Sequence, residues 1–148
     1  MSNKAKLRLN NELYAMLKDA SFKIILEKDD DLFKWIILLP GPEASPYEGG
    51  IFKISFEFPE TYPFREPTVK FVTPIYHPNV HNSGYMCKAV NNNWTPLNKA
   101  EEVIEKIYSL MFEPNLEDVF EYDIGKVFEK DRDGFNKTAR EWTLKYAI

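Results

Sequence analysis

From Phe52 to Phe58 the chain alternates between apolar and polar residues, and this alternation limits what it can fold into. Every second position is large and apolar, namely Phe52, Ile54, Phe56 and Phe58. The positions between them carry Lys53, Ser55 and Glu57. Because successive side chains of a β-strand point to opposite faces, residues 51–58 are predicted to form a strand with one buried and one solvated face. Such a strand belongs in an antiparallel sheet that is covered on one side.

Three further segments have strand character, at residues 22–27, 32–39 and 68–72. In the second of these, one face carries the apolar residues Phe33, Trp35, Ile37 and Leu39. A polar turn at residues 28–31 and loops containing proline separate the strands. Four successive strands joined in this way predict an antiparallel meander.

Helical periodicity flanks the predicted sheet on both sides. Residues 3–19 predict an amphipathic first helix, since apolar residues recur at Leu9, Leu13, Met16 or Leu17, and Ala20. A buried central helix that ends before Pro114 is indicated by Ala100, Val103, Ile104, Ile107 and Met111. A shorter helix is marked by Ile124, Val127 and Phe128, and a final one by Phe135, Ala139, Trp142 and Tyr146. The order of elements predicts an α+β fold. Because the sequence shows no internal repeat and no linker, residues 1–148 are expected to form one domain.

The bulk composition excludes several classes of protein. A hydrophobic content of 44% and an aromatic content of 15% argue against disorder. No apolar run is long enough to cross a bilayer, and the first residues lack the apolar core of a secretory signal. One cysteine cannot form an internal disulfide, which favours a cytoplasmic or nuclear location. With a net charge of −4, the chain is not expected to bind nucleic acid. We also expect a monomer that does not bind a membrane.

The single cysteine, Cys87, lies in a long loop at residues 74–98 that shows no convincing period. A loop of this length inside a compact domain is usually functional. Asn79 lies eight positions before Cys87. A cysteine attacks as its thiolate, and an asparagine amide can donate a hydrogen bond to the oxyanion that forms at an acyl centre. The alternative is that Cys87 is a small buried hydrophobe, as most lone cysteines are.

Many short motifs stand together in this chain in one recognisable order. They are Gly41-Pro42, Ser45-Pro-Tyr-Glu-Gly-Gly50, Phe58-Pro59, Tyr62-Pro-Phe64, Pro67, Ile75-Tyr-His-Pro-Asn79, Gly84, Cys87, Trp94, Pro96, Pro114-Asn115, Asp118, Ala139-Arg-Glu-Trp142 and Lys145-Tyr-Ala. Over essentially its whole length the chain therefore resembles the ubiquitin-conjugating (E2) enzymes. The most specific part of the resemblance is His-Pro-Asn followed by cysteine at this spacing, with Tyr-Pro-Phe upstream and Trp-x-Pro downstream.

The resemblance implies the E2 fold and transthioesterification. An activating enzyme (E1) would pass ubiquitin to Cys87 as a thioester, and a ligase (E3) would direct the acyl group to a lysine or to its own cysteine. Neither a metal nor an organic cofactor is expected at this site. A thioester carbonyl is already reactive, so the protein mainly has to position the amine and support the oxyanion.

The resemblance also implies roles for the neighbours of Cys87. Asn79 would support the oxyanion or order the loop, and both roles stay open. Tyr76 and Asp118 match positions that line the groove for the acceptor lysine, where a carboxylate would orient the amine and help remove its proton. Asp118 could instead cap a following helix. His77 is structural in this motif, so we do not expect it to act as a base.

The ligase-facing positions of the family fall on Phe64 and on Thr95, Pro96 and Leu97. Together with Arg8 they would form the surface for RING, HECT or RING-between-RING ligases. The first helix carries the basic residues Lys4, Lys6 and Arg8. It would bind the activating enzyme, in keeping with a partner that has an acidic groove. The alternatives are scattered surface apolar residues and a solvated helix face.

Several positions depart from the family pattern, and Lys88-Ala89 matters most. The family usually has leucine and then aspartate or serine after the cysteine. An E2 subclass that lacks this acid passes ubiquitin only to ligase cysteines, and we hypothesise that this chain leans the same way, although Asp118 argues against a complete loss of lysine transfer. Lys88 is predicted to favour the Cys87 thiolate, unless its ammonium group points into water.

Other functions compete with this interpretation. A cysteine hydrolase would have only His77 or His81 as its base, both on the same loop as Cys87. A zinc site from these three residues would be one ligand short. A more serious alternative is a catalytically silent E2-like scaffold that binds ubiquitin, although silent variants typically lose the cysteine or the His-Pro-Asn. An E2 for another modifier, such as SUMO or NEDD8, is also possible.

Overall fold

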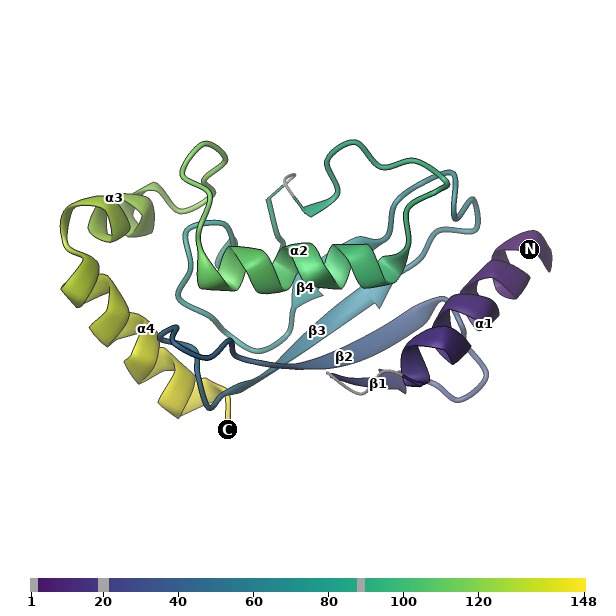
Figure 1. The fold of residues 1–148 in the computed structure, drawn as a ribbon, viewed down its shortest axis with the longest axis horizontal. Helices are drawn as coiled ribbons and strands as arrows, with labels where there is room; N and C mark the ends of the chain where they lie inside the picture. Colours follow the sequence, from purple (N-terminus) through teal and green to yellow (C-terminus); the bar gives the residue numbers. More distant parts are fainter. Residues whose placement is uncertain (1–2, 19–21, 88–89) are drawn as a thin grey trace.

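The computed structural model describes residues 3–18, 22–87 and 90–148. Within these ranges the chain forms four strands and four helices (Figure 1). In chain order they are α1 (Asn3–Leu17), β1 (Lys23–Leu26), β2 (Lys34–Pro40), β3 (Ile51–Glu57), β4 (Thr68–Phe71), α2 (Ala100–Phe112), α3 (Tyr122–Lys130) and α4 (Arg132–Tyr146). The predicted α+β order is confirmed, and the predicted strand ends differ from the observed ones by at most two residues.

The sheet is an antiparallel meander in the order β1-β2-β3-β4. Trp35 pairs with Phe56, and Ile37 pairs with Ile54, so the buried faces of β2 and β3 coincide. These four side chains are at most 1% exposed. The register therefore follows from the alternation in the sequence, because a slip of one residue would turn the apolar side chains into solvent.

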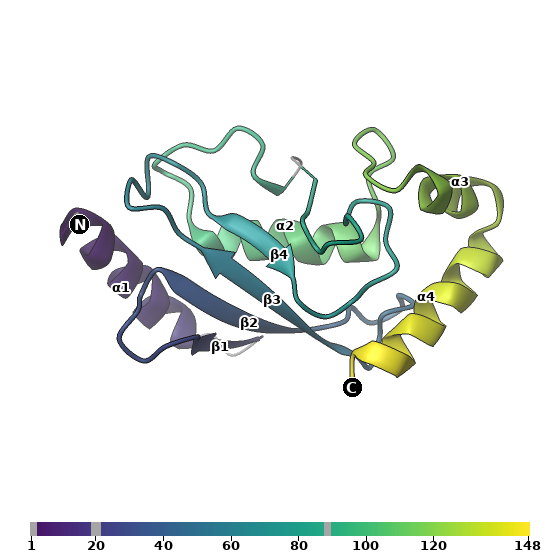
Figure 2. The same ribbon diagram turned by 180° about the vertical axis from the view of Figure 1, so that it is seen from behind.

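Helix α2 covers the apolar face of the sheet, and the two views of the fold agree on this (Figures 1 and 2). Its buried face consists of the five residues predicted from their spacing, namely Ala100, Val103, Ile104, Ile107 and Met111. Helix α1 and helix α4 lie at opposite ends of the sheet in both views. The long loop between β4 and α2 runs along the same side as α2, and it carries Cys87.

The buried faces of the terminal helices differ from the predicted ones. In α1 the buried residues are Ala5, Leu9, Glu12 and Met16, whereas Leu17 is 59% exposed. The predicted last residue of this helix, Asp19, and the apolar Ala20 lie outside the described residues. In α4 the buried residues are Phe135, Ala139 and Thr143, while Trp142 and Tyr146 are exposed.

Near the C-terminal end of α4, Thr143 is the buried residue because the helix packs closely against Gly50 at this point. A Cβ atom on Gly50 would lie only 2.6 Å from Cγ2 of Thr143, so a larger side chain on either residue would not fit. The Ile51 amide also donates to the Ala147 carbonyl at 2.9 Å. This tie fixes the end of the chain to the start of β3. In the part of the chain that the structure describes, no helix could cross a membrane.

Candidate active site

Cys87 is held next to Asn79 by a short hairpin inside the long loop. The Cys87 amide donates to the Asn79 carbonyl at 3.0 Å, and Val80 pairs with Met86 in an antiparallel bridge. Gly84 closes the hairpin with φ +102°, a left-handed conformation that favours glycine. Its carbonyl accepts from the Phe71 amide at 2.8 Å. The hairpin is therefore fastened to β4, the last strand of the sheet.

The Asn79 side chain is fully buried and all of its hydrogen-bonding groups are engaged. Its Nδ2 donates to the carbonyls of Asn115 at 2.7 Å and Asp118 at 2.6 Å. Its Oδ1 accepts from the Asn115 amide at 2.8 Å. These bonds hold residues 115–118 against the turn that contains Asn79, whose carbonyl also accepts the hydrogen bond from the Cys87 amide. Of the two roles predicted for Asn79, this geometry favours ordering of the loop.

His77 anchors the same segment to α2. Its Nε2–H donates to the Leu110 carbonyl at 2.6 Å, and its Nδ1 accepts from the Asn79 amide at 3.0 Å. A carbonyl can only accept and an amide can only donate, so the ring must be the neutral Nε2–H tautomer. Burial lowers the pKa of His77 to about 4, and the bond to Leu110 only partly opposes this effect. The structural role expected of His77 agrees with these contacts.

Asp118 lies half-buried in the segment that Asn79 holds. The amides of Phe120 and Glu121 both donate to the Pro78 carbonyl, at 2.9 and 3.1 Å. The next helix, α3, starts only at Tyr122, and Glu121 occupies its N-cap position. Asp118 is therefore not the cap of this helix, so the alternative considered for it from the sequence is wrong.

Cys87 itself is only 2% exposed. It lies on a small cavity of about 170 Å³ that is lined by Glu66, Pro67, Thr68, Val69, Tyr85, Met86, Val90 and Asn91. A reacting group that approaches through this cavity would come between Glu66 and Pro67 on one side and Val90 and Asn91 on the other. Lys88 and Ala89 lie outside the described residues, so the hypotheses about them stay predictions.

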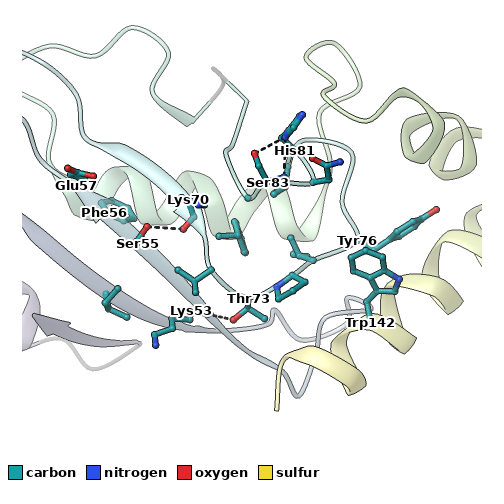
Figure 3. A pocket seen from close by; sticks show the side chains of 18 of the residues that line it. Lys53, Ser55, Phe56, Glu57, Lys70, Thr73, Tyr76, His81, Ser83 and Trp142 are labelled. Carbon is teal, nitrogen blue, oxygen red and sulfur yellow. Dashed lines mark hydrogen bonds between the residues drawn. The ribbon is translucent and has the colours of Figure 1, made fainter. Parts of the chain in front are cut away.

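Tyr76 lies at the edge of a larger cavity of about 760 Å³, next to Trp142 (Figure 3). Its ring centroid is 5.5 Å from that of Phe135 and 5.7 Å from that of Trp142, both on α4. Burial raises the pKa of its phenol. Cys87 does not line this cavity. The structure thus groups Tyr76 with α4 rather than with Cys87, and its role at an acceptor lysine stays a prediction.

The residues predicted to face a ligase lie on two loops that end in exposed apolar side chains. The Phe64 loop (residues 59–67) presents Phe64, which is 73% exposed. The Leu97 loop (residues 95–98) presents Leu97, which is 88% exposed, and its neighbours Thr95 and Pro96 are exposed as well. Lys6 on α1 is also exposed. These side chains are accessible to a partner.

Arg8 differs from the other predicted surface residues. Its guanidinium donates to the Pro96 carbonyl at 2.8 Å, to the Asn98 carbonyl at 2.6 Å and to Glu12 at 2.8 Å. The side chain is 26% exposed. Sequence reasoning missed Glu12, although it lies three residues after Leu9 and four before Met16 and so falls on the buried face of α1.

The residues first weighed for a hydrolase or zinc site are otherwise engaged. Both ring nitrogens of His77 already form hydrogen bonds. The Nδ1 atom of His81 contacts Ser83 at 2.7 Å, as Figure 3 shows, and its ring lies against Phe120. Among the described residues, no group of three or more histidine, cysteine, aspartate or glutamate side chains is placed to hold a metal ion.

Comparisons with known proteins find similarity over nearly the whole chain. A family model described as "Ubiquitin-conjugating enzyme" matches residues 8–143. The chain is 43% identical over 145 residues to "Ubiquitin conjugating enzyme E2 B" of Dictyostelium discoideum, covering 97% of this chain and 98% of that protein. It is 37% identical over 148 residues to "Probable ubiquitin-conjugating enzyme E2 31" of Arabidopsis thaliana, with coverages of 99% and 96%. Its structure resembles that of a "putative ubiquitin conjugating enzyme" from Plasmodium yoelii, with a TM-score of 0.92 at 31% identity, covering 100% of this chain and 98% of that one.

Proposed function

Because this chain belongs to the ubiquitin-conjugating enzyme (E2) family, we propose that Cys87 is the residue that carries ubiquitin as a thioester. The observation that supports this assignment is the hairpin that holds Cys87 beside Asn79, the asparagine of the His-Pro-Asn motif. Cys87 is also the only cysteine in the chain. E2 enzymes work between an E1 and an E3, so these are the general partners of the protein.

The reaction then consists of two acyl transfers at one sulfur. The Cys87 thiolate attacks the thioester carbonyl on the activating enzyme, and the cysteine thiolate of that enzyme leaves. In the second step an acceptor amine or thiolate attacks the new thioester, and the Cys87 thiolate leaves in turn. When the acceptor is a lysine, its nitrogen must lose a proton as the amide forms. Each step exchanges one bond to the carbonyl carbon for another, so no redox cofactor is needed.

Asn79 and Asp118 serve the second step in this proposal. Asn79 orders residues 115–118 through its three side-chain hydrogen bonds. In this proposal, the ordered segment places Asp118 where its carboxylate would orient an incoming amine and accept its proton. Tyr76 would line the groove through which the acceptor lysine enters.

The choice of acceptor depends on Lys88 and Ala89 as well as on Asp118. Ala89 cannot help to deprotonate a lysine, so we expect faster transfer to cysteine than to lysine. Rapid discharge of the charged enzyme by free lysine would contradict this. Lys88 is expected to raise the thiolate fraction of Cys87, so Lys88→Leu should slow alkylation of Cys87 at pH 7. An unchanged alkylation rate would remove this role.

The proposed partner surfaces follow from exposure and charge. The ligase would contact Phe64, Thr95, Pro96 and Leu97, and RING, HECT and RING-between-RING ligases are all candidates. Lys6 on α1 would face the activating enzyme. We propose that residues 1–148 act as one catalytic domain and a monomer, in the cytoplasm or nucleus. SUMO or NEDD8 in place of ubiquitin, or a silent ubiquitin-binding scaffold, are the competing assignments.

One experiment tests the assignment. The protein is mixed with ubiquitin, its activating enzyme and ATP, and the products are separated on a non-reducing gel. We expect the parent protein to form an adduct that thiols remove. The Cys87→Ser variant should form an adduct that resists thiols, because an oxygen ester replaces the thioester. Parallel reactions with SUMO and NEDD8 and their own activating enzymes identify the modifier. Absence of an adduct with every modifier would favour the silent scaffold.

A further inference from the structure

The carboxylate of Glu12 on α1 is buried and accepts hydrogen bonds from Arg8, Tyr62 and Ala100. It is 6% exposed. Its Oε1 accepts from the Ala100 amide at 2.8 Å, at the start of α2. Its Oε2 accepts from the Tyr62 hydroxyl at 2.6 Å and from Nε of Arg8 at 2.8 Å. Burial of a carboxylate is tolerated only with such donors, so Glu12 depends on all three.

Glu12 also completes the start of α2. The N-cap residue of this helix, Lys99, makes no side-chain cap hydrogen bond. The first amides of a helix lack partners within the helix and are usually satisfied by such a cap. Here the carboxylate comes from another helix, 88 residues earlier in the chain. The start of α2, which directly follows the Leu97 loop, is therefore held by α1.

Arg8 extends the same contacts to the Leu97 loop. Its two terminal nitrogens donate to the carbonyls of Pro96 and Asn98. Its guanidinium carbon lies 5.7 Å from the centre of the Tyr62 ring. Because Glu12 binds Nε of the same guanidinium, the orientation of the whole planar group is set by this carboxylate. The backbone on both sides of Leu97 is thus fastened to α1.

Tyr62 connects Glu12 to the Phe64 loop, the second loop with an exposed apolar tip. The Tyr62 ring is 2% exposed and lies 5.7 Å from that of Trp94. Trp94 in turn donates to the Pro63 carbonyl at 2.7 Å, one residue before Phe64. The Arg8–Glu12–Tyr62 cluster is therefore the point at which the two exposed loops meet.

We propose that Glu12 is a positioning residue: through Arg8 and Tyr62 it fixes the Phe64 loop and the Leu97 loop relative to each other. The identity of the partner rests on the function proposed above, in which both loops face a ligase. Two exposed apolar tips bind one partner well only when their separation is set before binding, since ordering them on binding weakens affinity. Glu12 would thus affect ligase affinity without touching the ligase.

Amide hydrogen exchange tests the positioning directly and requires no partner. Glu12→Gln turns one acceptor oxygen into a donor that faces other donors, and Tyr62→Phe removes only a hydroxyl. The matched controls are Glu48→Gln, since Glu48 caps the Ala44 amide at 2.7 Å, and Tyr14→Phe, since Tyr14 is 65% exposed on the same helix as Glu12. After correction for global stability measured in urea, we expect exchange of the Ala100, Leu97 and Asn98 amides to rise at least about tenfold in the first two variants and not in the controls. Equal rates in all four proteins would overturn the proposal.

A double-mutant cycle tests the consequence for binding. With an isolated RING domain that binds the parent protein, Glu12→Gln should weaken affinity about tenfold. If Glu12 acts through the exposed tips, its effect should fall below about twofold when Phe64→Ala and Leu97→Ala are already present, because coupled residues are not additive. Additive losses would show a separate structural effect and would contradict the proposal. If Cys87 is charged but no RING domain binds, the ligase part of the proposed function fails, whereas the exchange rates still decide whether Glu12 positions the loops.

Discussion

The buried neutral His77 makes the stability of the fold sensitive to pH in a defined range. A histidine has an unperturbed pKa of about 6.5, whereas burial lowers the pKa of His77 to about 4. Between these two values the unfolded chain binds a proton that the folded chain excludes. The free energy of unfolding should therefore be highest above pH 6.5 and should fall as the pH drops from 6.5 towards 4.

The size of this fall follows from the two pKa values. A difference of about 2.5 pKa units corresponds to a limit of about 3 kcal/mol, of which about 2 kcal/mol should be lost between pH 7 and pH 5. Ordinary carboxyl groups stay mostly ionised over this interval, so they contribute little to the change. A loss of about 2 kcal/mol is a substantial part of the stability of a domain of this size.

Urea unfolding at pH 7, 6 and 5 measures the loss, and the second histidine provides the control. His81 is exposed, so His81→Gln should leave the pH dependence intact, whereas His77→Gln should remove it. In the folded parent protein, the imidazole resonance of His77 should not titrate between pH 7 and pH 5, and its nitrogen shifts should show the Nε2–H tautomer. A His77 resonance that titrates near pH 6.5, or an unfolding free energy that is the same at pH 7 and pH 5, would refute the reasoning.

Three further substitutions test other parts of the site, each by urea unfolding. Gly84→Ala should destabilise the fold by about 2 kcal/mol or more, because its Cβ would lie 2.2 Å from the Phe71 carbonyl oxygen at a positive φ. Gly49→Ala is the matched control, with φ +88° and no atom within 4 Å, and should cost only about 1 kcal/mol. Asn79→Ala should cost about 3 kcal/mol, since it leaves three backbone groups without partners, and a loss below about 1 kcal/mol would contradict the ordering role. Leu97→Ala should change stability by less than about 0.5 kcal/mol, because the side chain is 88% exposed, and a larger loss would show that this loop belongs to the core.

The parts of the fold that could be predicted from the sequence are those that repeat locally. Strand β3 and helix α2 show their buried faces in periods of 2 and 3.6 residues, and every apolar residue assigned to those faces is buried. In α4 the same periodicity selected Trp142 and Tyr146, which are exposed. The close approach of this helix to Gly50 instead leaves room only for Thr143 and Ala147. The distance between α4 and Gly50 therefore determines which residues of α4 are buried. The periodicity of the sequence does not reveal this distance.

The partners of the polar residues could not be predicted, because they are distant in the chain. Asn79 finds its acceptors 36 and 39 residues later, and Glu12 finds its donors as far as 88 residues away. The spacing places Glu12 on the buried face of α1, but its charge argued for a solvated residue, since a carboxylate is almost never fully buried unless it is paired. Only the arrangement of the Phe64 loop and the start of α2 around α1 makes its burial possible.

The geometry of Asn79 bears on how the thioester is expected to react on this scaffold. Its amide group already donates twice, to Asn115 and Asp118, so donation to an oxyanion would require one of these bonds to break. Breaking a buried hydrogen bond costs about 1–3 kcal/mol, which would offset much of what one oxyanion donor contributes. A thioester carbonyl needs less activation than an amide carbonyl, whereas an acceptor amine must be placed within bonding distance and deprotonated. We therefore propose that Asn79 contributes more by ordering residues 115–118 than by leaving that position to contact the carbonyl oxygen.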